Sequence, residues 1–411
     1  MSAAIKRDIA VIGAGPAGAA AAIKAAAGGA RVTVFEKGSP GRDKACGDAL
    51  TPRAVTALGD LGVCIDDAHH TAGLRMIAGA KRRELLWPHG NRFGADGAVW
   101  PRRALDHHLV KAAENAGAEI VWNTEVLPTI ADDGTAVGVE QAEGGARWQA
   151  DLVVLAAGAP GAAARMLGAE RVSTEPYGVA IRTYAPSPRH DEHLLEACLT
   201  LQSSEGSWLP GYGWLFPAGD GTVNIGAGVS STMKGFRSLN LNRLLNDYRA
   251  MSAREWDLGD YLERPRAWRL PMSAARRHGA GWAAVGDAAG LVNPMNGEGI
   301  DYGLESGMLL AERFLADPAT ATSSYDRILG ERFDSFLSTG RRFCLLIGHP
   351  WILRNGLRLT MSSDSIADIT LQVMGNLIDG DSEGLSARVL RVADRALRLA
   401  DPLLRRASSA A

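Results

Sequence analysis

The 411-residue chain has few cysteines, few aromatic residues, little net charge and no long apolar run. Its four cysteines form no CxxC pair and no metal-ligand spacing, so neither a zinc site nor a disulfide framework is expected. The formal net charge of −2 argues against a general nucleic-acid binder, which carries a strong basic excess. No run of about 18 apolar residues predicts a transmembrane helix. Because the N-terminus runs straight into a predicted strand, we expect no signal peptide and a cytoplasmic protein with reduced thiols.

Length and composition bound the fold class. The chain is 46% hydrophobic and 22% charged, as in ordinary soluble globular proteins. Its length exceeds the size that one hydrophobic core usually serves, so we expect two domains.

The first fifty residues carry the pattern of a dinucleotide-binding unit. A β-branched strand at residues 8–12 runs directly into GAGPAG at 13–18, followed by an alanine-rich helix. A second strand at 31–35 then ends at Glu36, whose carboxylate can accept hydrogen bonds from an adenosine ribose. The first glycine permits a tight turn, the second lets the backbone approach a pyrophosphate, and the third lets the helix pack on the sheet. The predicted cofactor contacts here are Gly13, Gly15, Ala17, Gly18 and Glu36.

Two later segments favour FAD over a nicotinamide cofactor. Residues 151–158 form a buried strand that ends in small residues, and 286–294 carry a GD-x6-P pattern followed by NGEG at 296–299. Both resemble the flavoprotein hydroxylases and reductases, and the alternative is a Gly-Asp turn in an ordinary α/β unit. In those proteins the Asp contacts the ribityl chain, and the next helix N-terminus faces the flavin and stabilises negative charge on it. The resemblance implies contacts from Asp287, Gly299 and Ile300.

A second dinucleotide fingerprint is absent, because GAPG at residues 158–161 lacks the spacing that opens a helix. The chain is therefore not built like a disulfide reductase with two dinucleotide domains.

Aromatic residues make up only 6% of the chain, yet three fall in the run GYGWLFP at 211–217. Tyr212, Trp214 and Phe216 alternate with other residues, so all three point to one face of a predicted strand. A second strand at 221–228 follows a short turn and predicts a hairpin. In an arbitrary sheet such a face is core. Beside a flavin it is a wall for an apolar substrate.

Three motifs together resemble the geranylgeranyl reductase family, FAD enzymes that saturate isoprenoid double bonds. They are CGDALTPRAV at 46–55, the aromatic run, and the GD-x6-P-x-NGEG segment, and the resemblance spans residues 8–315. The form of the first motif is most similar to the actinobacterial branch that reduces menaquinone. In this family the aromatic run lines the substrate cavity.

The resemblance also implies individual cofactor contacts. Cys46 and Gly47 would lie against the flavin ring, and Asp48 and Ala49 are further predicted cofactor contacts. Arg102 would touch the phosphates or flavin, and Val126 would contact the adenine through its backbone.

The Cys46 thiol has two interpretations: it tunes the flavin or touches the alkene, or it is a small apolar wall residue. The candidates for the catalytic proton donor are Cys46, Tyr212 and a bound water.

Flavin-dependent halogenases and aromatic monooxygenases are the alternative enzyme class. Halogenases carry a WxWxIP strand, whereas here Tyr212 replaces the first Trp and Phe216 replaces the Ile. They also need a catalytic lysine in an early segment, for which Lys81 is the candidate. A prenyl-lipid carrier with a vestigial flavin site is the alternative that is not an enzyme.

Beyond residue 315 helical patterns replace the glycine-rich strands, and one helix carries separate basic and apolar faces. The basic face holds Arg388, Arg391, Arg395 and Arg398, and the apolar one holds Val389, Val392, Ala396 and Leu399. Such a helix either contacts an anionic membrane surface or packs on the protein body with its arginines in water. Both alternatives stay open, so localisation includes the inner face of the cell membrane.

We therefore expect an α/β protein with a Rossmann-like FAD fold of the aromatic hydroxylase and geranylgeranyl reductase type. An antiparallel-sheet substrate domain and a helical C-terminal region complete it. The FAD-binding domain would comprise residues 1–75, 100–165 and 268–340, the substrate domain 76–99 and 166–267, and the helical region 341–411.

The expected reaction is hydride transfer from reduced FAD to an isoprenoid alkene, with a proton added to the other carbon. The expected partners are a prenyl lipid or prenylquinone and an external electron donor, which is NAD(P)H, ferredoxin or another reductase.

Overall fold

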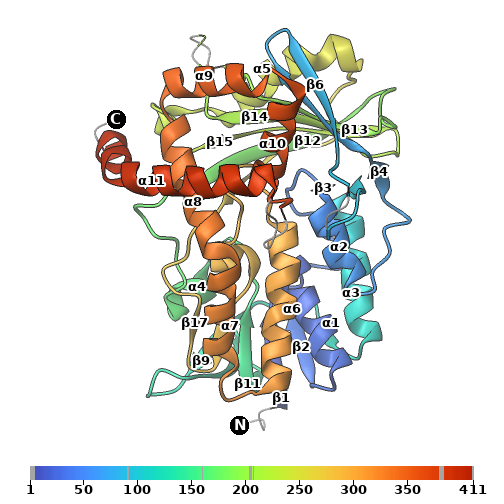
Figure 1. The fold of residues 1–411 in the computed structure, drawn as a ribbon. Helices are drawn as coiled ribbons and strands as arrows, with labels where there is room; N and C mark the ends of the chain where they lie inside the picture. The colour runs from blue at the N-terminus through green and yellow to red at the C-terminus, as the bar shows by residue number, and fades with distance from the viewer. Residues whose placement is uncertain are drawn as a thin grey trace.

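A mostly parallel eight-stranded sheet forms the lower half of the molecule in Figure 1, a computed structural model. The structure describes residues 5–89, 92–159, 161–202, 206, 208–378 and 384–409. Strand β1 (Ile5–Ile12) lies between its parallel partners β2 (Val32–Phe35) and β11 (Arg147–Leu155), and β18 (Trp282–Ala284) extends the sheet beyond β11. The remaining strands are β8 (Glu119–Val121), β9 (Val126–Ile130), β10 (Ala136–Gln141) and β17 (His278–Gly279). The three strands expected from the sequence at residues 8–12, 31–35 and 151–158 are confirmed as β1, β2 and β11.

Two helices meet at the cofactor end of this sheet because their facing residues are small. Helix α1 (Pro16–Ala27) is mostly buried alanine, and α6 (Ile300–Ala316) places Gly303 and Gly307 against it. A Cβ at Gly307 would lie 2.3 Å from the carbonyl oxygen of Ala17, so only glycine permits this approach. The N-termini of both helices thereby reach the same cavity. The other helices of this half are α2 (Pro52–Gly59), α3 (Arg102–Asn115), α4 (Ala162–Leu167) and α7 (Ala321–Leu329).

A seven-stranded sheet forms the upper half in Figure 1, in the order β16-β12-β15-β14-β13-β5-β6. All its pairs are antiparallel except that of β13 with β5. The expected hairpin is confirmed, because β14 (Gly211–Pro217) pairs antiparallel with β15 (Thr222–Ser230). The other strands are β5 (Gly73–Ala78), β6 (Lys81–Leu86), β12 (Gly178–Pro186), β13 (Leu194–Cys198) and β16 (Arg266–Leu270). A small sheet of β3 (Ala49–Leu50), β4 (His69–Thr71) and β7 (Gly97–Val99) lies beside them.

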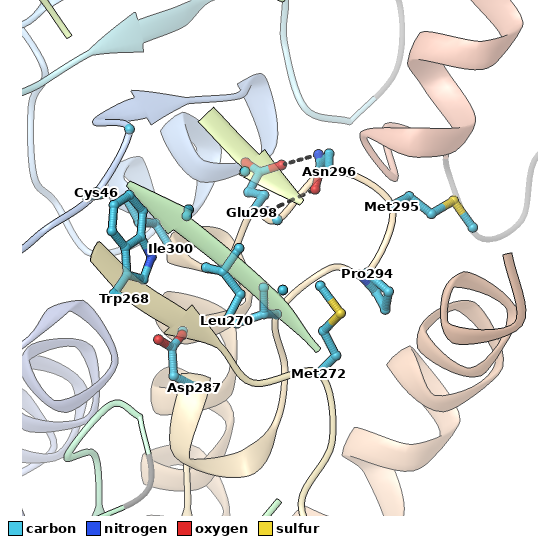
Figure 2. A pocket seen from close by; sticks show the side chains of 18 of the residues that line it. Cys46, Trp268, Leu270, Met272, Asp287, Pro294, Met295, Asn296, Glu298 and Ile300 are labelled. Carbon is cyan, nitrogen blue, oxygen red and sulfur yellow. Dashed lines mark hydrogen bonds between the residues drawn. The ribbon is translucent and has the colours of Figure 1, made fainter. Parts of the chain in front are cut away.

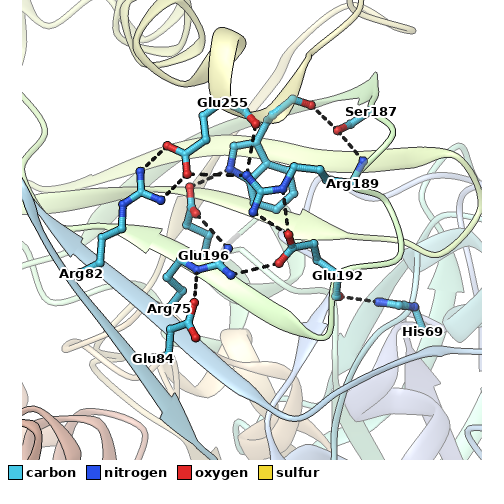
Figure 3. Close-up of polar contacts among 10 residues, drawn as sticks. His69, Arg75, Arg82, Glu84, Ser187, Arg189, Glu192, Glu196 and Glu255 are labelled. Carbon is cyan, nitrogen blue, oxygen red and sulfur yellow. Dashed lines mark hydrogen bonds and ion pairs between the residues drawn. The ribbon is translucent and has the colours of Figure 1, made fainter.

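Helix α5 (Leu241–Trp256) is fixed to one face of this sheet by a polar network (Figure 3). Arg75 on β5 pairs with Glu84 at 2.9 Å and with Glu192 at 3.1 Å. Glu196 on β13, within 3.5 Å of Arg75, accepts a hydrogen bond from the indole N–H of Trp256 at 2.9 Å. Because buried charges are costly unless paired, Arg75 keeps Glu196 in place, and the bond from Trp256 to Glu196 holds α5 on this face. The face of the sheet opposite α5 lines a cavity.

Four C-terminal helices confirm the expected helical region: α8 (Ser335–Ile347), α9 (Pro350–Thr360), α10 (Asp364–Met374) and α11 (Leu385–Ser409). Leu397 and Leu404 of α11 bury against Leu345 of α8, which fixes the inner face of α11. Its outer face stays exposed and carries arginines and apolar residues together. Within the part of the chain that the structure describes, no helix is long and apolar enough to cross a membrane.

Candidate active site

One continuous cavity of about 940 Å³ joins the two halves of the molecule. It begins at the glycine-rich loop after β1, passes the loop that holds Cys46, and follows the aromatic strand β14 to helices α8–α11. Figure 2 shows part of it, with Cys46, Trp268, Asp287 and Glu298 around the same space. A nucleotide end and an apolar end therefore share one continuous volume.

The three loop glycines are needed for different reasons. Gly13 has a φ of +108°, and a Cβ there would stand 2.5 Å from the carbonyl oxygen of Ala156. A Cβ at Gly18 would come within 2.0 Å of the carbonyl oxygen of Gly13, so these two positions serve the fold itself. Gly15 is different, because its nearest neighbours would be guanidinium nitrogens of Arg102 and Arg42 at 3.9 and 4.0 Å. It faces an open cradle between two cations at the N-terminus of α1.

Glu36 is held at the edge of this cradle. Its buried carboxylate accepts the backbone N–H groups of Ala14 at 3.1 Å and Gly38 at 2.9 Å. Arg42 pairs with it at 3.0 Å. The carboxylate is thus fixed beside the glycine-rich loop, where an adenosine ribose would be bound.

Arg102 lies on the other side of the cradle. It is buried and forms a bidentate pair with Asp106 through nitrogen–oxygen distances of 2.7 and 2.8 Å, which fixes the guanidinium plane. Its neighbour Arg103 is exposed. Val126, the first residue of β9, also lines the cavity at this end.

Asp287, Gly299 and Ile300 lie together where α6 begins, as the GD-x6-P pattern implies. A Cβ at Gly299 would be 3.1 Å from the Asp287 carboxylate, and Ile300 starts the helix. Burial raises the pKa of Asp287, while the charges of Lys44 and Arg102 lower it. A carboxyl group and free helix N–H groups therefore face the same part of the cavity.

The loop that holds Cys46 is tied to the distant seven-stranded sheet. The carbonyl oxygen of Cys46 accepts hydrogen bonds from Arg182 Nε at 3.1 Å and from Asn224 Nδ2 at 2.9 Å. Arg182, which is fully buried, also pairs with Asp43 at 2.9 Å and with Glu263. Burial raises the pKa of the Cys46 thiol, and nearby Arg102 opposes the shift. The residue therefore lines the cavity as a neutral thiol on a fixed backbone.

Asp48 anchors the same loop from within the protein. It adopts a φ of +66° and is wholly buried. Its carboxylate accepts hydrogen bonds from the Tyr184 hydroxyl, from Asn224 Nδ2 at 2.8 Å and from the backbone N–H of Arg102 at 3.3 Å. Burial raises its pKa to about 6, against the effect of these hydrogen bonds and of Arg182. The side chain of Asp48 is thus used to hold the loop, and a cofactor would meet its backbone.

We expect Asp48 to make the protein less stable as pH rises from about 4 to about 6, the interval between its unfolded and folded pKa values. Below this interval both states hold the proton. Within it only the folded state does so, and above it neither does. A difference of about two pKa units corresponds to about 3 kcal/mol. Chemical denaturation of wild type and Asp48→Asn at several pH values tests this, and the variant should show a smaller loss. Equal losses would contradict it.

The aromatic strand presents Tyr212, Trp214 and Phe216 to the cavity. Neighbouring ring centroids along the strand are 5.8 and 6.0 Å apart, and Trp268 of β16 lies 6.3 Å from Trp214. Trp214 is only 4% exposed and belongs to a buried apolar cluster. The aromatic side chains therefore line the cavity, and Trp214 and Phe216 also belong to a buried apolar cluster. On the opposite face, Gly213 packs against the ring of Tyr248 from α5.

Lys81, the candidate for the catalytic lysine of a halogenase, lies outside the cavity. It starts β6, is exposed, and its Nζ donates to the carbonyl oxygen of Met361 at 3.4 Å. Lys81 does not line the cavity. Lys44 does line it, and would lie 3.8 Å from a Cβ at Gly158, at the nucleotide end.

Sequence reasoning missed the polar residues that hold the site together. Arg182 and Asn224 each interrupt an otherwise apolar strand, and this interruption was the available signal. Asn224 also accepts the indole N–H of Trp214 at 2.9 Å, so it links the aromatic wall to Cys46 and Asp48. Glu298 belongs to the NGEG motif, but the motif did not predict that its side chain lines the cavity.

The residues at the nucleotide end fit a flavin dinucleotide. The cradle at Gly15 leaves room for backbone approach, two guanidinium groups flank it, and the N-terminus of α1 has no side-chain cap. These features suit a pyrophosphate, and the fixed carboxylate of Glu36 suits a ribose.

Known proteins resemble this chain over most of its length. Residues 6–325 match the family model described as FAD binding domain. Menaquinone reductase of Mycolicibacterium smegmatis is 39% identical, over 96% of this chain and 98% of that protein. Digeranylgeranylglycerophospholipid reductase 1 of Methanopyrus kandleri is 30% identical, over 74% of this chain and 79% of that protein.

Two solved structures share the fold. A geranylgeranyl bacteriochlorophyll reductase-like protein of Thermoplasma acidophilum has a TM-score of 0.77, at 20% identity over 95% of this chain and all of that one. The flavin-dependent brominase Bmp2 has a TM-score of 0.76, at 17% identity over 97% of this chain and 99% of that one. The fold alone does not separate reductases from halogenases, whereas the two sequence relatives named above are reductases. The chain belongs to the FAD binding domain family and, within it, to the geranylgeranyl reductase family, with FAD as its cofactor.

Proposed function

We propose that this protein is an FAD-dependent reductase that saturates a carbon–carbon double bond of an isoprenoid chain. The prenyl side chain of menaquinone is the first candidate substrate, followed by related geranylgeranyl or polyprenyl lipids. The observation that carries the proposal is the single cavity that leads from the cofactor cradle along the aromatic strand into apolar helices. The relatives named reductases of menaquinone and of geranylgeranyl lipids support the same substrate class.

The apolar end of the cavity suits a chain without polar groups. Leu74, Met76 and Leu195 line one part of it, and Leu353, Leu371 and Leu397 line the part formed by C-terminal helices. Each buried isoprene unit would contribute roughly 3–4 kcal/mol, at about 0.8 kcal/mol per carbon group removed from water. The wall can therefore bind a prenyl chain without recognising a head group.

The site residues divide into those that hold the cofactor and those that hold the alkene. Gly15 and Glu36 would bind the dinucleotide, while Arg182 and Asn224 fix the Cys46 backbone that we place against the flavin ring. When bound and reduced, FAD supplies the hydride. The aromatic strand would orient the alkene and exclude water.

The division into an FAD-binding domain, a substrate domain and a C-terminal region is part of this proposal. The seven-stranded sheet takes its strands from residues 73–86, 178–230 and 266–270. Two of these segments cross the boundaries expected at residues 75/76 and 267/268.

The deciding experiment uses purified holoprotein, dithionite as reductant and menaquinone under anaerobic conditions. The product should gain two hydrogens for each saturated bond, as measured by mass spectrometry. Geranylgeranyl lipids tested in parallel would show which chain is preferred. A product that depends on chloride or bromide would support a halogenase instead, and binding without any product would support a carrier.

We also propose that the outer face of α9 and α11 contacts an anionic phospholipid surface. Trp351 of α9 is 76% exposed, and Val392 and Leu399 of α11 are 66% and 84% exposed. Exposed arginines stand beside them: Arg354, Arg358, Arg388, Arg391 and Arg395. Leu359 and Val389 are exposed and also line the cavity, so it reaches the surface at both helices. A prenyl lipid could thus pass from the bilayer into the cavity.

Substituting Arg388, Arg391 and Arg395 together by Gln should weaken binding to vesicles of anionic phospholipid by about 100-fold, at about 1 kcal/mol for each arginine near the surface. Co-sedimentation with vesicles measures the change. A matched triple substitution of Arg103, Arg147 and Arg165 to Gln, exposed on the nucleotide half, should have little effect. Equal loss in both variants would show a nonspecific charge effect and contradict this surface.

A further inference from the structure

A carboxyl group lines the cavity beside the predicted flavin contacts. Glu298 lies on the loop before α6, and Figure 2 shows it next to Asn296 in the same pocket as Cys46. Its Oε1 accepts a hydrogen bond from the Thr51 hydroxyl, and its Oε2 accepts from Asn296 Nδ2 at 3.3 Å. The second contact is long, so one carboxyl oxygen is only weakly held.

A second carboxyl group, Asp301, is buried behind it in the first turn of α6. Asp301 has no exposed surface, and neither of its carboxylate oxygens has a hydrogen-bond partner among the described residues. Arg53 approaches it only to 3.5 Å, because its Nε is bound to Glu305 at 2.6 Å. The buried Arg53 guanidinium thus faces the carboxyl groups of Glu298, Asp301 and Glu305, and Glu305 has a second cation, Arg332, at 3.9 Å. Glu298 and Asp301 cannot both ionise beside this one shared guanidinium in a low-dielectric interior.

The surroundings therefore favour the protonated forms. Burial raises the pKa of Glu298, against the hydrogen bonds from Thr51 and Asn296 and the charge of Arg53. Burial and the nearby charge of Glu298 raise the pKa of Asp301 well above its usual range. The other titratable neighbours of this cluster, Tyr212 and Tyr302, are buried phenols whose pKa values are raised as well. The Glu298–Asp301 pair can hold a proton at neutral pH.

Two of the three donors considered from the sequence, Tyr212 and Cys46, are less suited to this task. The hydroxyl of Tyr212 donates to the carbonyl oxygen of Asn296 at 2.6 Å, and a backbone carbonyl cannot return a proton to it. The raised pKa of the Cys46 thiol makes loss of its proton unfavourable. Glu298 carries a carboxyl group, lines the cavity and has a second carboxyl group, that of Asp301, behind it.

We propose that Glu298 donates the proton that completes reduction of the alkene, and that Asp301 is a positioning residue that keeps this proton on the pair. This inference rests on the proposed function. The π bond of the alkene breaks, one carbon receives the hydride, and FAD returns to its oxidised form. The other carbon receives the proton of the Glu298 carboxyl, which becomes a carboxylate. The Glu298 carboxylate then takes up a proton from water. An external two-electron donor such as NAD(P)H regenerates reduced FAD.

The protonation state can be tested without turnover. Infrared spectra of the oxidised holoprotein at neutral pH should contain a protonated-carboxyl C=O band that shifts in D2O. Glu298→Gln should remove or diminish this band, and Asp301→Asn should change its position. The half-buried acid Glu312, on the same helix as Asp301 and 3.3 Å from Lys24, provides the control Glu312→Gln with an unchanged band. Identical spectra of wild type and Glu298→Gln would overturn the proposal.

Catalysis is tested by mixing dithionite-reduced protein with menaquinone and following product in a single turnover. Glu298→Gln should slow product formation by at least about 100-fold, the usual contribution of a general acid. FAD content, thermal midpoint and menaquinone binding should match wild type. Glu298→Asp keeps an acid one methylene further back and should recover part of the rate, which a purely structural role would not explain.

A wild-type rate in Glu298→Gln would overturn the assignment, as would a comparable loss found only in Tyr212→Phe or Cys46→Ala. Failure of wild type itself to reduce any prenyl substrate would refute the proposed function and with it the donor role. The infrared result would still report the buried proton, so the two failures can be told apart.

Discussion

Replacing Gly15 by Val should yield a folded, colourless protein. A Cβ at this position meets no protein atom closer than 3.9 Å, and the backbone φ of −76° suits any residue. The fold should therefore tolerate the side chain. The valine would project into the cradle between Arg42 and Arg102, where we place the pyrophosphate, so FAD retention should fall from stoichiometric to nearly none.

The neighbouring glycines show why Gly15 is the informative choice. Substitution of Gly13 would strain a positive φ and clash with Ala156, and substitution of Gly18 would clash with Gly13. Loss of FAD in either variant could follow from misfolding alone. Gly59→Val is a matched control, because a Cβ there meets nothing within 4 Å and Gly59 is not among the residues that line the cavity.

The measurement pairs the absorbance of bound flavin with circular dichroism and the thermal midpoint after removal of cofactor. If apoproteins of wild type and Gly15→Val have equal thermal midpoints, and only wild type binds flavin, the pyrophosphate site at Gly15 is supported. Normal yellow protein from Gly15→Val would show that the dinucleotide lies elsewhere.

The sequence was sufficient to predict the parts of the site that are built from residues close together in the chain. The strand, turn, helix, strand and acid of the first 36 residues appear in the structure as β1, the glycine-rich loop, α1, β2 and the fixed carboxylate of Glu36. Each glycine there has a local reason, so a motif can represent it. The hairpin of β14 and β15 was predictable for the same reason.

The rest of the site depends on contacts between distant segments. Cys46 could be noticed in the sequence, but the partners of its carbonyl, Arg182 and Asn224, lie 136 and 178 residues away. A buried polar residue in an apolar strand signals that a partner exists, without identifying it. The cluster around Glu298 was hidden likewise, because Thr51 and Arg53 come from α2 and its approach.

Sequence periodicity also could not predict which face of the C-terminal helix α11 packs against the protein. The spacing of arginines and apolar residues predicted two faces on α11, and both alternatives for it stayed open. The structure shows that Leu397 and Leu404, outside both stripes, make the inward contacts. The predicted apolar stripe is therefore free to be exposed, and Val389 from it also borders the cavity.

Trp214→Ala should lower the free energy of unfolding by about 3–5 kcal/mol, the usual cost of truncating a buried large side chain. The indole packs between Tyr212 and Phe216 and lies on the bare backbone of Gly226, where a Cβ would stand 2.1 Å from it. Its N–H also holds Asn224, which in turn holds the Cys46 loop. The loss should therefore affect stability and catalysis together.

Because both effects are expected, the experiment needs a control of equal stability cost. Leu215 is the next residue on the same strand, is wholly buried, and points to the opposite face. Leu215→Ala should cost about 2–5 kcal/mol without widening the cavity. Both variants are to be assayed well below their thermal midpoints, with FAD occupancy measured in each.

If the aromatic strand is a wall for the prenyl chain, only Trp214→Ala should reduce menaquinone slowly or saturate a different double bond. The space left by the indole would let the chain shift relative to the flavin, and misplacement by about 1 Å can cost on the order of 100-fold. Mass spectrometry with fragmentation locates the saturated bond. The same rate and product pattern in both variants would mean that Trp214 acts only through stability, and the aromatic strand would then be core alone.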